Sequence, residues 1–210
     1  MMNKLAEDME SRAGKGGGRL LELWTAQTQA VLDTLESEGV TYVRNEYVDK
    51  KYQGSAWIFR TAYKEMGKLM SARVPRPEEA QSPIWLYKNR QWVFGGEGSF
   101  LMRLAVPSDE VAFFDLRDWS RVLNLELLGT EKEREAFDNE LRRQGVSVSS
   151  DLFEKPWYPV LKKKVTDSWN KSLLREEKDL DPVYTQAAVW RLKKEWIREC
   201  LPYRSVQTSG

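Results

Sequence analysis

Nine tryptophans and no histidine among 210 residues constrain this chain more than any other feature of its sequence. A tryptophan buries a large ring and carries one N–H that needs an acceptor, so nine of them indicate a folded body with large aromatic anchors. Histidine is the commonest general base near neutral pH and a frequent metal ligand. Its absence excludes Ser-His and Cys-His nucleophile systems and every zinc site that needs imidazole. No motif in the sequence identifies a reaction.

Length and composition indicate one globular domain without disulfide support. The chain has 41% hydrophobic and 31% charged residues, and no clear linker divides it in two. Cys200 is its only cysteine, which excludes an internal disulfide and cysteine-rich zinc or iron–sulfur sites. The sequence shows neither a signal-peptide pattern nor an apolar run near about 18 residues, so we expect a soluble, cytoplasmic protein.

The charge balance gives no overall attraction to nucleic acid or to a membrane. Lysine and arginine total 33, aspartate and glutamate total 32, and the net charge is +1. Basic clusters do occur at 162–164 and 191–198, with aromatic residues among them, as in many nucleic-acid binders. Glu195 and Glu199 interrupt the second cluster, and a solvated helix face gives the same pattern. Nucleic-acid binding is therefore the less favoured interpretation.

Residues 1–19 are expected to form a flexible extension ahead of a single globular domain over residues 20–206. The stretch Gly14-Lys15-Gly16-Gly17-Gly18 has the composition of a hinge. A phosphate-binding loop is the alternative interpretation of these glycines. It requires a preceding apolar strand, a GxxxxGK[ST] spacing and a following helix, and the sequence has none of them.

Hydrophobic periodicity and turn residues predict an α+β fold, a single compact domain with a small mixed or antiparallel sheet packed by several helices. Apolar runs predict strands at 20–24, 40–43, 84–87, 91–94, 100–106 and 111–116. The strands at 84–87 and 91–94 flank three polar residues, which suggests a hairpin. Capping residues and apolar spacing predict helices at 26–38, 56–70, from Asp118 to about Leu127, 131–144, 165–173 and 183–200, with loop at 147–159.

Candidate site residues lie where predicted elements meet. Asp115 ends an apolar strand, a place where α/β folds often position a functional carboxylate, but Asp115 or Asp118 can equally cap the helix that carries Trp119. Gln186 stands at the start of the predicted last helix, where it can bind a ligand amide or satisfy free N–H groups. Trp24 and Gln27 likewise place a tryptophan and a glutamine at a predicted strand-to-helix junction. Two such junctions suggest a polar pocket.

Several short patterns occur in an order that resembles a known family. From the N-terminus they are Leu23-Trp24-Thr25-x-Gln27, Pro83-Ile84-Trp85, Val106-Pro107-x-Asp109-Glu110-Val111, Asp115, Trp119, Val122-Leu123-Asn124, Ser168-Trp169 and Gln186-Ala187-x-x-Trp190-x-Leu192. No pattern is specific alone, but the co-linear set resembles the bacterial domain of unknown function 3841 family over roughly residues 20 to 200. That family often has Trp-His where Trp119-Ser120 stands here. The resemblance implies a compact α+β domain in a bacterial or phage-borne intracellular protein, and no established activity.

Three functions remain open. The first is a binding or regulatory module that recognises a small ligand or a protein without a cofactor or metal, through a pocket lined by Trp24, Gln27, Asp115, Trp119 and Gln186. The second is an enzyme of the ADP-ribosyltransferase type, a fold-level analogy in which NAD is the substrate and Arg103 and Glu195 are the candidate catalytic residues. The third is nucleic-acid binding. We expect no membrane partner.

Overall fold

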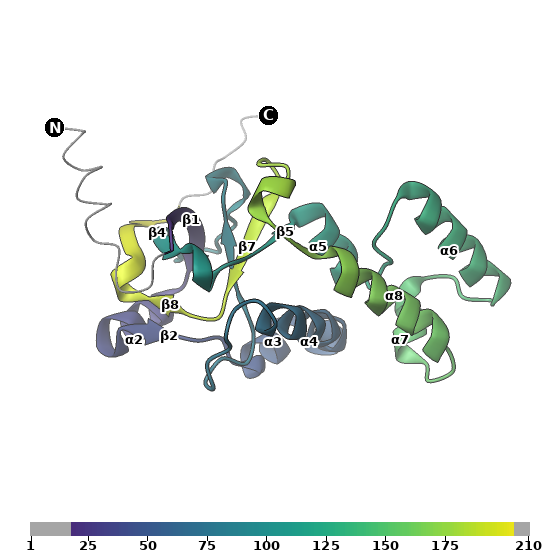
Figure 1. The fold of residues 1–210 in the computed structure, drawn as a ribbon. Coiled ribbons are helices and arrows are strands. Elements are labelled where there is room, and N and C mark those ends of the chain that lie inside the picture. Colours follow the sequence, from purple (N-terminus) through teal and green to yellow (C-terminus); the bar gives the residue numbers. More distant parts are fainter. Residues whose placement is uncertain (1–17, 204–210) are drawn as a thin grey trace, which may run out of the picture.

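The computed structural model describes residues 18–203, apart from the side chains of residues 47–49 and 51. The predicted extension lies outside the described residues except for Gly18 and Arg19. The described chain contains an antiparallel sheet of seven strands in the order β6-β5-β7-β3-β1-β4-β9 (Figure 1). These strands are β1 (Leu20–Gln27), β3 (Ile84–Tyr87), β4 (Phe100–Pro107), β5 (Ala112–Asp115), β6 (Leu174–Arg175), β7 (Thr185–Val189) and β9 (Ile197–Pro202).

A two-stranded sheet and the helices complete the fold. The small sheet pairs β2 (Val40–Thr41) with β8 (Leu192–Lys193). The α-helices are α2 (Gln29–Glu38), α3 (Asn45–Tyr52), α4 (Ala56–Ser71), α5 (Leu116–Leu123), α6 (Glu131–Arg143), α7 (Ser149–Glu154) and α8 (Pro159–Ser172). Short 3₁₀ turns occur at Gln53–Ser55, Arg90–Trp92, Ser108–Glu110, Glu177–Asp179 and Lys194–Trp196. The α+β fold class with an antiparallel sheet is confirmed.

The two faces of the large sheet belong to two hydrophobic cores. Side chains alternate along β3, so Ile84 and Leu86 pack into one core while Trp85 faces the other. The first core includes Leu35 of α2 and Leu192 of β8. The second begins at the sheet with Phe114 and continues through buried residues of α4, α5, α6 and α8. In Figure 1 these helices extend to the side away from α2, with α6 and α7 farthest from the sheet.

Several elements were predicted correctly because short-range features of the sequence, such as apolar spacing and capping residues, determine them. Helix α4 was expected at 56–70 and occupies Ala56–Ser71, where apolar residues recur at spacings of three and four. Thr130 and Glu133 form the predicted capping box at the start of α6. Gly39 ends α2 with a φ of 76°, a left-handed conformation that glycine adopts without a steric penalty. The strands expected at 84–87, 100–106 and 111–116 are present as β3, β4 and β5.

The predicted hairpin over 84–94 is wrong. Strand β3 pairs with β1 and β7, which lie far away in the sequence, and Arg90–Trp92 form a 3₁₀ turn. The Asn89 side chain accepts a hydrogen bond from the backbone N–H of Gln91, and the Trp92 indole N–H donates to the carbonyl of Val183. These contacts hold residues 89–92 in a turn, so the segment that follows β3 does not pair with β3 as a second strand.

The predicted last helix over 183–200 is also wrong, because this segment forms β7, β8 and β9. All five residues of β7 are buried, since the strand lies between β5 and β3 with a core on each face. Such a strand shows no alternation of apolar and polar residues, so its apolar spacing resembled that of a helix. Helix α7 occupies part of the predicted loop over 147–159, and α3 occupies a polar stretch for which no element was predicted. Helix α2 begins at Gln29, because β1 continues to Gln27.

Candidate functional site

The sheet brings Trp24 and Gln186 onto one face, with Tyr87 between them. Trp24 lies opposite Tyr87 across β1 and β3, and Tyr87 lies opposite Gln186 across β3 and β7. Directly opposed residues of antiparallel strands point to the same side, so the three side chains form a row. Arg103 of β4 extends this row on the other side of Trp24. The Arg90 guanidinium lies 5.5 Å from the ring centre of Trp24.

Trp119 belongs to the aromatic packing beside this row. Its ring centroid lies 4.7 Å from that of Trp85 and 5.9 Å from those of Tyr63 and Phe114. Trp119 is buried against both the sheet and α4. It therefore anchors α5 on the core, and its ring is enclosed by other aromatic rings.

Gln186 is buried within strand β7, and this corrects its expected place at a helix start. It is 3% exposed, and its Oε1 is a buried polar atom without a hydrogen-bond partner. Burial raises the pKa of Tyr87 above its ordinary value, although a hydrogen bond with the Gln186 amide acts in the opposite direction. Burial is also the main cause of the raised pKa of Tyr63. Both phenols therefore stay neutral near pH 7, as hydrogen-bonding groups rather than bases.

Gln27 and Asp115 do not join the row. Gln27 is three residues from Trp24 on the same strand, so it points to the opposite face, where its Nε2 donates to Thr25 Oγ1 at 2.8 Å. Asp115 is the N-cap of α5 and accepts from the backbone N–H of Arg117 at 2.8 Å. The Arg117 guanidinium also contacts Asp115, at 2.6 Å. The capping interpretation of Asp115 is confirmed.

Electrostatics around Asp115 fit this capping role. Burial alone raises the pKa of the carboxyl, but the Arg117 side chain, its backbone N–H and its charge together lower the pKa below the ordinary value. The carboxylate is thus ionised near neutral pH and already paired, which leaves it with a structural role.

The two candidate catalytic residues have separate partners. Arg103 forms ion pairs with Glu22 at 3.1 Å and Glu199 at 3.4 Å. Glu195 is exposed in a 3₁₀ turn and lies 3.5 Å from the Lys193 ammonium. Within residues 18–203, no hydrogen bond or ion pair joins Arg103 to Glu195.

Carboxylates neutralise much of the basic clusters. Lys163 pairs with Asp167 and Lys164 with Glu140, each at 2.6 Å. In the second cluster, Arg191 pairs with Glu110 and Lys194 with Glu36, each at 2.5 Å. These side chains form intramolecular pairs and offer little free charge to a polyanion.

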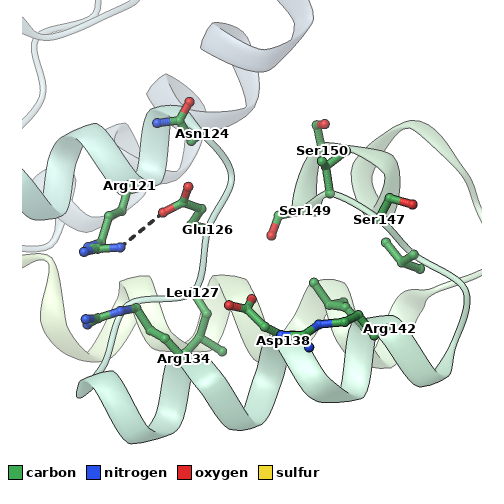
Figure 2. Close-up of a pocket in the computed structure, with 13 residues that line it drawn as sticks. Arg121, Asn124, Glu126, Leu127, Arg134, Asp138, Arg142, Ser147, Ser149 and Ser150 are labelled. Atoms are coloured by element: carbon green, nitrogen blue, oxygen red, sulfur yellow. Dashed lines mark hydrogen bonds and ion pairs between the residues drawn. The ribbon is translucent and has the colours of Figure 1, made fainter.

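A cleft between α5, α6 and the segment 146–150 has a volume of about 690 Å³ (Figure 2). This volume lies within the range of about 300–1,000 Å³ that is typical of small-molecule sites. The lining residues come from these three walls and are mostly polar. They are Arg121, Asn124, Glu126, Leu127, Arg134, Asp138, Leu141, Arg142, Val146, Ser147, Val148, Ser149 and Ser150. None of the predicted site residues lines this cleft.

The loop that follows α5 forms one wall of the cleft, and α8 holds it in place. The Trp169 indole N–H donates to the carbonyl of Glu126 at 2.7 Å. Ser168 Oγ accepts a hydrogen bond from the backbone N–H of Leu128 at 2.9 Å. Leu125, the residue before Glu126, is fully buried and has a φ of 57°, a costly conformation for a branched side chain. Packing and hydrogen bonds therefore fix an otherwise unfavourable loop.

The charged groups of the cleft are arranged at its two ends. In Figure 2 the Arg121 and Arg134 side chains lie at one end, and Asp138 projects into the cleft near Ser149. Arg121 Nη1 lies 3.3 Å from Glu126, and Arg134 donates to the carbonyl of Gly129. Among the described residues, neither Arg134 nor Asp138 takes part in an ion pair. The cleft can thus offer both cationic donors and hydroxyl or carboxylate acceptors to a ligand.

Sequence reasoning missed this cleft because no single segment builds it. Residues 147–159 were expected to be loop, so the serines there had no predicted neighbour. One signal was present: Val122-Leu123-Asn124 and Ser168-Trp169 were both part of the family pattern. In the structure, Ser168 and Trp169 form hydrogen bonds with the loop that follows Val122-Leu123-Asn124.

None of the described helices has the length and apolar character needed to cross a membrane. Within residues 18–203, no three Cys, Asp or Glu side chains gather where they could hold a metal ion. No curated protein and no solved structure matches the chain. One family model does match, over residues 22–198, which include the helices, the cleft and most of the sheet. The chain therefore belongs to the family described as domain of unknown function (DUF3841).

Proposed function

We propose that this protein is a binding module that takes a small polar ligand in the cleft between α5, α6 and residues 146–150. The observation that supports it is a hollow of about 690 Å³ with mostly polar walls. The wall formed by residues 124–128 is fixed by Trp169 and Ser168, so it needs little reorganisation when a ligand binds. A preformed site loses less conformational entropy on binding.

A filled cleft tests this proposal. Figure 2 shows the Ser149 hydroxyl pointing into the hollow, so Ser149→Trp places a large ring where a ligand would lie. Ser37→Trp is the matched control, because Ser37 is exposed on α2 and does not line the cleft. Both variants and the wild type are screened by thermal unfolding against sugars, nucleosides, amino acids and their phosphorylated forms.

A compound at about 100 times its Kd stabilises the native state by about 2.7 kcal/mol, which raises the Tm of a chain this long by roughly 5–10 °C. We expect such a rise for the wild type and for Ser37→Trp, and none for Ser149→Trp. A compound that stabilises Ser149→Trp as much as the wild type binds elsewhere and contradicts the proposal.

The row of Trp24, Tyr87 and Gln186 is a second candidate ligand site, favoured by the unpartnered Oε1 of Gln186. Gln186→Leu removes this acceptor and keeps a side chain of similar size. If the row binds the ligand, Gln186→Leu abolishes the Tm rise while Ser149→Trp keeps it. The opposite result assigns binding to the cleft.

A further inference from the structure

One end of the cleft carries a positive charge that no carboxylate neutralises. Arg134 is half-buried on α6, and its guanidinium donates to the backbone carbonyl of Gly129. This hydrogen bond orients the Arg134 guanidinium, but a carbonyl is neutral and so leaves the positive charge of the guanidinium unpaired. Among the ion pairs of residues 18–203, none includes Arg134.

Arg121 adds a second guanidinium at the same end. Its contact with Glu126 is 3.3 Å long, and both side chains are around 40% exposed, so the pair is loosely held. Each of the two arginines keeps donors that no described residue uses, since a guanidinium has five N–H groups. Guanidinium groups are well suited to phosphate oxygens, because they can donate two parallel hydrogen bonds to them.

The rest of the cleft favours hydroxyl groups. Asp138 projects into the hollow from α6, and the Ser149 hydroxyl points into it from the facing segment, which also contributes Ser147 and Ser150 to the lining. A carboxylate accepts hydrogen bonds from the hydroxyls of a sugar, and serine hydroxyls can both donate hydrogen bonds to them and accept hydrogen bonds from them. Leu127 and Leu141 add a small apolar surface to the lining.

We infer that the ligand is a phosphate ester carried on a hydroxylated small molecule, such as a sugar phosphate or a nucleoside monophosphate. This inference rests on the proposed function and names the ligand class of the same cleft. Arg134 and Arg121 bind the phosphate, and Asp138 with the serines binds the hydroxylated part. A nucleic-acid strand fits less well, because Glu126 and Asp138 line the cleft and repel a continuous polyanion.

Isothermal titration of the full chain tests the ligand class. The probes are adenosine 5′-monophosphate and ribose 5-phosphate, each compared with its unphosphorylated parent and with inorganic phosphate. Arg134→Gln removes one cleft charge that takes part in no ion pair of the described residues, and Lys132→Gln is the matched control, since Lys132 is exposed on the same helix and does not line the cleft.

The wild type and Lys132→Gln are expected to bind at least one phosphorylated probe at least tenfold more tightly than its parent. Arg134→Gln is expected to lose at least tenfold in affinity for that probe and less than twofold for the parent. Equal affinity for a probe and its parent, together with sensitivity to Ser149→Trp, contradicts the phosphate inference and leaves the binding module standing. Absence of binding by all probes, or binding that Ser149→Trp does not weaken, contradicts both.

Discussion

Trp169 connects the hydrophobic core to the cleft through one side chain. Its ring is fully buried and stacks on Phe153, with 5.9 Å between ring centroids and 3° between ring planes. The N–H of the same ring donates to the Glu126 carbonyl. The residue thus contributes apolar burial and also fixes the backbone that forms a wall of the candidate site.

Replacing this tryptophan separates the two contributions. Trp169→Phe keeps an aromatic ring and removes the N–H, so we expect a loss of about 2–3 kcal/mol in the free energy of unfolding, measured with urea. Trp190→Phe is the matched control, because Trp190 is equally buried and donates to the carbonyl of Val74, away from the cleft. Both variants should lose similar stability, but only Trp169→Phe should weaken ligand binding. Equal binding by the two variants would show that the Glu126 carbonyl does not shape the site.

Asp115 gives a prediction about pH. Its folded-state pKa is lowered by Arg117, so its ionised form contributes stability that is complete above the unfolded pKa of about 3.9. That contribution disappears as the pH falls through the folded-state pKa. Asp115→Asn keeps an acceptor for the cap, so it should cost about 1 kcal/mol at pH 7. The difference in unfolding free energy between wild type and variant should shrink at pH 3. A difference in unfolding free energy that is as large at pH 3 as at pH 7 would show that the ionised carboxylate of Asp115 does not contribute this stability.

Some single-residue roles could be predicted from sequence and others could not. The Asp115 cap depends on the backbone N–H of a residue two positions away, so the local sequence was enough to predict it. Gln186 depends on strands that pair across the whole chain, and its burial in β7 has no local signal. For the same reason Trp24 and Gln27 were expected to share a pocket, although strand alternation places them on opposite faces.

Helix α6 is the element on which the cleft depends most directly. It contributes Arg134, Asp138, Leu141 and Arg142 to the lining. Much of its exposed surface is charged, so only Phe137 and Leu141 are buried in the core. With so little apolar burial, the capping box at Thr130 and Glu133 supplies a substantial part of its stability.

Removing the cap should loosen this wall. Thr130→Ala removes the hydroxyl that accepts from the Glu133 backbone N–H, although the backbone N–H of residue 130 can still donate to the Glu133 carboxylate, and it should cost about 1 kcal/mol. Hydrogen exchange measured by mass spectrometry should become faster in peptides covering 130–137. Thr34→Ala, at a half-buried position inside α2, should leave the exchange of peptides covering 130–137 unchanged. Unaltered exchange at 130–137 in Thr130→Ala would mean that core packing alone holds the helix.

Elements that carry their own capping or periodicity signals were predictable, and those defined by long-range pairing were not. The capping box of α6 and the apolar stripe of α4 are local signals, and both were identified. Strand β7 has no such signal, because two cores cover it and two distant strands pair with it. The strand order of the large sheet follows from these long-range pairings, which the local sequence does not show. A hairpin at 84–94 was therefore predicted, whereas β3 pairs with β1 and β7.

Across the whole molecule, one core connects the sheet to the cleft. Phe114 of β5, Trp119 of α5 and Trp169 of α8 belong to the same cluster of buried residues. The helices that form the cleft therefore extend from the sheet without a break in packing (Figure 1). We expect the site to unfold together with the sheet, as one cooperative unit.

The tryptophans themselves allow the most direct test of where a ligand binds. Each of the nine indole N–H groups gives one signal in a ¹⁵N-correlated NMR spectrum, and they report on different parts of the fold. On titration with adenosine 5′-monophosphate, we expect the Trp169 indole and the backbone amides of 121–127, 134–142 and 146–150 to shift, while the indoles of Trp24 and Trp85 stay in place. Shifts at Trp24 and Trp85 with an unchanged Trp169, or no shift at millimolar ligand, would contradict binding in the cleft.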